Sequence, residues 1–156
     1  RPWRYVWSVR SSECAKQVVA TIPRSECVLA SACRFDEVED VTARCAAELW
    51  ARCREDRDDP WFRLLVDHVN LTSHPLLWPD DVFESRLRGL SIRRTLDRRR
   101  RLVAKAYEAV AASSSKSSLP LLRRCYALVA SRAYWLKDDL ALVPLVDFAN
   151  HRDAAS

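Results

Sequence analysis

The sequence predicts a single α+β domain over residues 1–156 that is mostly helical, and three observations support this class. A chain of 156 residues with 49% hydrophobic content can build one sizeable core but not two. The apolar runs at residues 18–23 and 27–30 are short and end at turn-forming residues, as strands do. From residue 37 onwards apolar residues recur mainly at helical spacing, so we expect helices to form most of the domain.

We divide the domain into four segments, beginning with short strands in residues 1–35. Residues 36–112 are expected to form a large helical region. Its first helix covers residues 37–54, with Asp36 as the N-cap, because apolar side chains recur there every three or four residues. The charged tract that follows ends this helix before Pro60.

Three further helices are expected in the helical region. A short helix covers residues 61–70, and another begins after Pro79, with Asp80 as its cap, and runs to Arg88. The longest covers residues 91–112, because one apolar stripe runs along it and can face the core. The stripe consists of Ile92, Leu96, Val103, Tyr107 and Val110.

The remaining segments are a serine-rich loop at residues 113–118 and a helix followed by a strand in residues 119–156. The loop is not a domain boundary, because the next helix carries apolar side chains that are needed to cover the same core. Those side chains are Leu122, Cys125, Tyr126, Val129, Ala133 and Leu136. After this helix, residues 140–143 form a short apolar run that is typical of a buried strand.

Polar residues follow this apolar run directly. Pro144 lacks a backbone donor, and Asp147, Asn150 and His151 place polar groups just beyond it. A buried strand that ends in a polar corner is one interpretation. The other is an ordinary element terminus, at which Asp147 and Asn150 merely cap backbone groups.

This motif resembles the Asn-His signature of SET-domain proteins in the Rubisco large-subunit methyltransferase-like branch. The run Leu128-Val-Ala-Ser-Arg132-Ala-Tyr-Trp is similar to the Ser-Arg-aromatic helix of that branch, and Val18-Val-Ala-Thr-Ile-Pro23 is similar to its first strand. The resemblance covers residues 18–151. It implies a partial SET domain with short N-terminal strands, a large helical insertion and a C-terminal strand that ends at Asn150-His151.

The resemblance also implies a cofactor site. In an S-adenosylmethionine-dependent enzyme of this branch, Arg132 would contact the cofactor carboxylate, Asn150 and His151 its amino and adenosine parts, and a downstream tyrosine would complete the site. The family carries a glycine-rich loop before its first strand, whereas the only glycine here is Gly89. The chain is therefore identified as an incomplete and degenerate member. We expect no bound cofactor, no catalytic residue, and an open edge on the strand at residues 140–146.

Arginine dominates the positive charge of this chain. The net charge is +5, with 22 arginines and 4 lysines, and arginine binds phosphate or carboxylate with two donors. Four successive arginines at residues 98–101 go most of the way round a helix, so one must lie at the edge of the apolar stripe beside an acidic partner. The expected anion-binding ridge consists of Arg93, Arg94, Arg98 and Arg101. The ridge is expected to bind RNA phosphate or an acidic protein surface; the alternative is a solvated face paired with Asp97 and Glu108.

The cysteines and histidines point away from a metal site. No two cysteines form a Cys-x-x-Cys pair, so we expect buried free thiols, no zinc and a reducing intracellular compartment. The histidines also lack metal-ligand spacing. These residues are Cys14, Cys27, Cys33, Cys45, Cys53 and Cys125, with His68, His74 and His151. No apolar run reaches the roughly 18 residues of a membrane span.

Two functions from different classes remain open. In the first, the chain is a non-catalytic SET-fold structural subunit that packs against other subunits of a ribonucleoprotein and contacts RNA or acidic protein through its arginine-rich helix. An organellar ribosome, for example in a mitochondrion, is the most natural host for so basic a chain. In the second, the chain is a fragment of a protein-lysine N-methyltransferase. The glycine-free N-terminal segment favours the first function.

Overall fold

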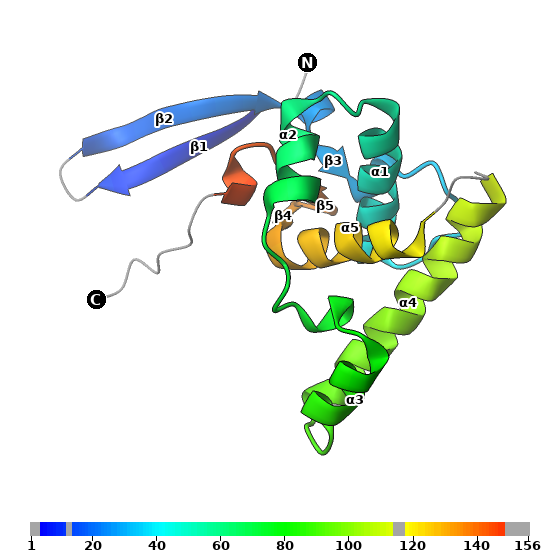
Figure 1. Ribbon diagram of the computed structural model, residues 1–156. Coiled ribbons are helices and arrows are strands. Elements are labelled where there is room, and N and C mark those ends of the chain that lie inside the picture. The colour runs from blue at the N-terminus through cyan, green and yellow to red at the C-terminus, as the bar shows by residue number, and fades with distance from the viewer. Residues whose placement is uncertain (1–3, 12–13, 114–117, 149–156) are drawn as a thin grey trace.

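The computed structural model describes residues 4–11, 14–113 and 118–148 of the chain, with side chains described from residue 21 onwards. The strands are β1 (Arg4–Ser11), β2 (Cys14–Pro23), β3 (Val28–Leu29), β4 (Tyr134–Leu136) and β5 (Asp139–Leu142). β1 and β2 form an antiparallel hairpin that extends away from the rest of the molecule, and β3, β5 and β4 form a separate antiparallel sheet in that order (Figure 1). Together with the helices, this sheet confirms a mostly helical α+β fold.

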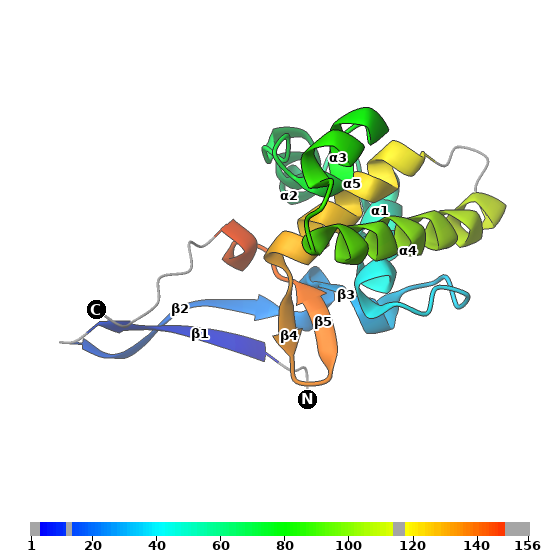
Figure 2. The ribbon, with the colours of Figure 1, turned by 90° about the horizontal axis from the view of Figure 1, so that it is seen from below.

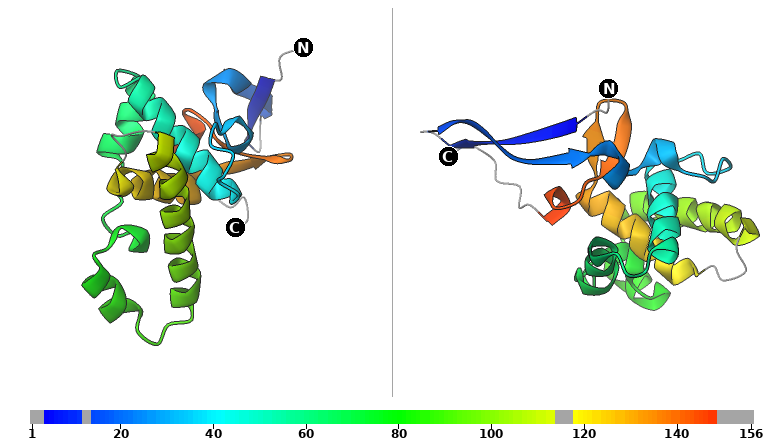
Figure 3. Two further views of the ribbon diagram at one scale, coloured as in Figure 1. Left: turned by 90° about the vertical axis from the view of Figure 1, so that its right-hand side faces the viewer. Right: turned by 90° about the horizontal axis from the view of Figure 1, so that it is seen from above.

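The described residues between β3 and β4 form five α-helices. They are α1 (Val41–Glu55), α2 (Pro60–Arg63), α3 (Asp80–Leu87), α4 (Ile92–Ser113) and α5 (Leu119–Arg132). Short 3-10 segments at Arg24–Glu26, Ala30–Ala32, Pro75–Leu77 and Val146–Phe148, and a π-helical segment at Leu64–His68, connect these elements. α1 packs against α5, and the small sheet lies on the opposite side of these helices from α3 (Figure 2). α3 and α4 form an arm that extends from the body (Figure 3).

The central strand β5 is buried on both faces. Leu140 and Leu142 belong to the main core formed with the helices, whereas Ala141 and Val143 pack in a second cluster with Ile22. This alternation follows from the two-residue period of a strand. β5 also pairs with β3 on one side and β4 on the other. The expected open edge on this strand is therefore wrong.

The strand is also shorter than expected. β5 ends at Leu142, and the chain then turns through Pro144 and Leu145, whose φ of 69° is unusual for a side chain with a Cβ atom. The Asp147 N–H donates to the Val143 carbonyl over 3.1 Å, which closes this turn instead of extending the strand. Asn150 and His151 lie outside the described residues.

Two of the expected helix caps are wrong. α1 begins at Val41 with Asp40 as its N-cap, because Asp40 Oδ1 accepts the Ala43 N–H over 2.9 Å, and the preceding residues form a turn. The predicted cap, Asp36, lies within that turn, which the N–H of the buried Val38 closes by donating to the Phe35 carbonyl. Asp80 is the first residue of α3 and makes no cap bond, because its carboxylate pairs with an arginine of α4.

The apolar stripe of the long helix is confirmed except at its first residue. Leu96, Val103 and Val110 are buried and Tyr107 is half-buried, but Ile92 is 49% exposed. Ile92 opens α4 at the tip of the arm, beyond the reach of α1 and α5 (Figure 1). Of the expected apolar face of α5, Leu122, Cys125, Tyr126 and Val129 are buried. The helix ends at Arg132, however, so the expectation that Ala133 and Leu136 belong to it is wrong; Leu136 is part of β4.

Candidate functional site

The end of α5 and the segment after β5 meet in space. Arg132, the last residue of α5, donates a hydrogen bond from Nη1 to the Asp147 carbonyl, and its guanidinium carbon lies 5.3 Å from the centre of the Phe148 ring. The next strand adds a second contact, because the Tyr134 hydroxyl donates to the Val146 carbonyl over 3.3 Å. The end of α5 and the segment Val146–Phe148 are thus held together by an arginine and a tyrosine. We call Arg132, Asp147 and Phe148 the Arg132 cluster.

Asp147 is the most buried charged group of this cluster. Its side chain is 3% exposed, and Oδ2 accepts a hydrogen bond from Trp61 Nε1 over 3.1 Å. Its other oxygen, Oδ1, is buried and has no hydrogen-bond partner within the part of the chain that the structure describes. Burial raises the pKa of this carboxyl above its ordinary value, and the Trp61 bond and the Arg132 charge oppose that shift only in part.

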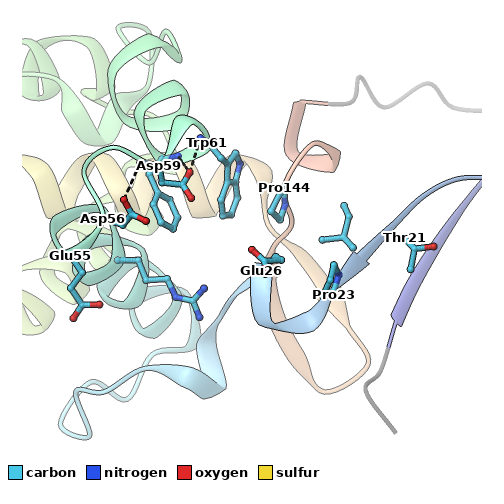
Figure 4. Close-up of a pocket in the computed structure, with 11 residues that line it drawn as sticks. Thr21, Pro23, Glu26, Glu55, Asp56, Asp59, Trp61 and Pro144 are labelled. Atoms are coloured by element: carbon cyan, nitrogen blue, oxygen red, sulfur yellow. Dashed lines mark hydrogen bonds between the residues drawn. The ribbon is translucent and has the colours of Figure 1, made fainter.

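Trp61 also lines a cavity of about 380 Å³ between α1, α2 and the end of β2. Figure 4 shows the Trp61 ring and Pro144 on one side of it, with Asp56 and Asp59 near the start of α2. These two carboxylates are engaged by the backbone: Asp59 Oδ1 accepts the N–H groups of Trp61 and Phe62 over 2.7 and 3.1 Å, and Asp56 accepts that of Asp59 over 3.1 Å. Asp59 is the N-cap of α2 and holds Trp61 in place for its bond to Asp147, and the Asp56 carboxylate fixes the turn before it.

The four arginines of the predicted ridge have different surroundings in the structure. Arg93 pairs with Glu84 of α3 over 2.6 Å and with Asp97 of α4 over 3.6 Å. Its charge therefore helps to hold α3 and α4 together. The other three ridge residues, Arg94, Arg98 and Arg101, are exposed. The prediction of Arg93 as a site for an external anion is therefore not supported by its surroundings, whereas those three arginines do face solvent.

The arginine at the edge of the apolar stripe is Arg100. Its guanidinium carbon lies 3.6 Å from the centre of the Phe83 ring, and it donates to the Trp78 carbonyl over 2.6 Å and to Asp80 over 2.7 Å. The expectation of an acidic partner at this edge is confirmed. Arg100 ties α4 to the start of α3, which is a structural role.

Sequence reasoning missed two buried carboxylates. Glu48 of α1 is 2% exposed and binds Arg34 and Arg52. Asp139 opens β5 and binds Arg24 over 2.8 Å, together with the backbone and hydroxyl of Ser31 over 3.0 and 2.5 Å. The i, i+4 spacing of Glu48 and Arg52 is a signal that could have found the first. No local signal exists for Asp139, whose partners lie more than 100 residues earlier in the chain.

The five described cysteines are unpaired, and four of them are buried: Cys27, Cys33, Cys45 and Cys125. Burial raises the pKa of Cys45 and of the half-buried Cys53 to about 12, so both are protonated and unreactive near neutral pH. Among the residues that the structure describes, no three metal-ligating side chains gather. No described helix combines the length and the apolar character needed to cross a membrane.

The chain was also compared with known proteins. No protein-family model, no curated protein and no solved structure matches it.

Proposed function

We propose that the chain is part of an S-adenosylmethionine-dependent protein-lysine methyltransferase of the SET class, with Arg132 in its cofactor site. The observation that carries this proposal is the contact of Arg132 with Asp147 and Phe148. This contact places an arginine beside the segment that leads directly to Asn150 and His151. The family resemblance implies cofactor contacts from Arg132, Asn150 and His151.

The Arg132 cluster offers groups that suit the amino-acid end of this cofactor. The Arg132 bond to the Asp147 carbonyl comes from Nη1, and a guanidinium carries further N–H donors that can bind a carboxylate. Asp147 Oδ1, for which the described residues offer no hydrogen-bond partner, is an acceptor that suits an ammonium group. When bound, the cofactor supplies the methyl group. The role of Arg132 in this proposal is to bind and orient the cofactor carboxylate.

A second candidate is a non-catalytic structural subunit of a ribonucleoprotein, such as an organellar ribosome. Two observations favour it. No glycine lies between Arg1 and Pro23, where the family needs close backbone approach to the cofactor. In addition, three arginines of α4 face solvent and can contact RNA.

Cofactor binding separates the two candidates. The protein is expressed from its complete open reading frame and titrated calorimetrically with S-adenosylmethionine. The methyltransferase proposal expects saturable binding, and Arg132→Gln should weaken it by about 1.5–3 kcal/mol, or roughly 10- to 150-fold, because a charged hydrogen bond is lost. Arg63→Gln, which removes an exposed arginine of α2, is the matched control and should bind like the parent.

Methyl transfer gives the second measurement. Radiolabelled cofactor should transfer its methyl group to lysine side chains of a protein mixture, and the Arg132→Gln variant should transfer less at limiting cofactor concentration. The methyltransferase proposal is refuted if the parent protein melts cooperatively but shows neither heat of cofactor binding nor methyl transfer. The structural-subunit candidate would then remain.

A further inference from the structure

The solvent-facing side of α4 carries a line of positive charge. Its residues follow one another at i, i+4, i+7 and i+11, which places them on one helix face at about 100° per residue. They are Arg94, Arg98, Arg101 and Lys105, and all four are exposed. At about 1.5 Å per residue the line is roughly 16 Å long. The buried residues Leu96, Val103 and Val110 occupy the opposite face, so the line points directly away from the core. We call these four residues the α4 basic line.

Two neighbouring arginines of α4 are used within the molecule, but most of the α4 basic line is not. Arg93 and Arg100 hold α3 against α4 through Glu84 and Asp80. Within the described residues, Arg94, Arg98 and Arg101 make no ion pair. Lys105 lies 3.0 Å from Glu39, but both side chains are largely exposed, and such pairs are weak.

Like charges along this line oppose helix stability. Arg94 and Arg98, Arg98 and Arg101, and Arg101 and Lys105 are neighbours at spacings of three or four residues, where like charges repel. A helix face that serves only solubility usually alternates the sign of its charges, so that such neighbours attract. A bound polyanion would relieve all three repulsions at once. This line therefore has the character of a binding surface.

We propose that the α4 basic line docks the phosphate backbone of a nucleic acid. The arginine fork binds phosphate with two donors, and cations along a straight helix suit a regular series of negative charges. A protein interface needs an apolar core, and the four residues of the line are all cationic. They also include no aromatic side chain for base stacking, so the contact is to the backbone and is independent of sequence. The line lies on the outer face of α4, a helix that runs from the tip beside α3 up to α5 (Figure 1). This inference holds for either proposed function.

The test measures binding of the full chain to a fluorescent single-stranded RNA by anisotropy across a salt series. Each phosphate contact contributes a slope of about 0.7 to the fall of log K with log salt, so Arg94→Gln, Arg98→Gln and Arg101→Gln together should flatten it by about 2. The matched control removes three exposed cations elsewhere, Arg57, Arg63 and Lys137, by the same change to glutamine. It should keep nearly the parent slope.

One further variant and one further probe complete the test. The triple replacement of the three arginines by lysine keeps the charge and should keep most of the salt slope, and circular dichroism confirms that each variant is folded. Equal slopes for the glutamine triple variant and the control would overturn the proposal. It would also be overturned by a parent that does not bind RNA, or that binds polyglutamate as tightly as RNA with the same loss in the triple variant.

Discussion

The replacement of Glu48 by glutamine tests the largest buried ionic contact of α1. The Glu48 side chain is 3% exposed and its carboxylate accepts three hydrogen bonds: from Arg34 Nε over 3.3 Å, from Arg34 Nη2 over 3.2 Å and from Arg52 Nε over 3.0 Å. Glutamine has nearly the same shape, so the change removes the charge without a cavity. Its amide nitrogen also places a donor where an arginine donor already points.

The expected loss of stability depends on how exposed the two arginine partners of Glu48 are. Removing one member of a buried ion pair costs about 3–5 kcal/mol when the other charge stays buried. Here the Arg34 and Arg52 side chains are 42% and 25% exposed, so water partly replaces the lost contacts. We therefore expect Glu48→Gln to lower the free energy of unfolding by about 2–4 kcal/mol, which corresponds to roughly 4–16 °C in Tm for a domain of this size.

Glu55 provides a matched control on the same helix. It also pairs with Arg34, but its side chain is 60% exposed, so Glu55→Gln should cost only about 0–1 kcal/mol. Urea unfolding followed by circular dichroism gives both values, and similar m-values would show that the unfolded states are comparable. The reasoning is refuted if the two variants lose the same stability, because burial would then not decide the strength of these ion pairs.

Two further predictions concern pH and backbone strain. Burial raises the native pKa of Asp147, so the stability that its protonated form contributes is full below the ordinary value of 3.8 and is lost as the pH rises through the native pKa. Asp147→Asn should therefore gain stability relative to the parent between pH 3.5 and pH 7 in urea unfolding; a constant difference would contradict this. Gly89 has a φ of 77° with open space around its Cβ position, so Gly89→Ala should cost about 1–2 kcal/mol through backbone strain alone, measured by thermal unfolding. An unchanged Tm would show that the α3–α4 turn adjusts its backbone without cost.

Much of the Arg132 cluster could be expected from local sequence. The Ser131-Arg132 motif and the run from Leu140 to Phe148 are short, and 15 residues separate Arg132 from Asp147, so one helix end and one hairpin are enough to bring them together. Trp61 could not be assigned in this way. Its bond to Asp147 joins residues 86 positions apart, and that pairing depends on how α2 is placed over the end of β5.

The sequence by itself determined the elements whose patterns are periodic. The apolar stripe of α4, the buried face of α5 and the position of an arginine at the stripe's edge all follow from the 3.6-residue period of a helix, which is a local property. The tertiary structure alone decided which charges are free. Arg93 and Arg94 are neighbours of one residue type, yet Arg93 faces Glu84 of α3 while Arg94 faces solvent. Whether an arginine can bind an external anion depends on the element packed beside it, and residue types along one helix do not carry that information.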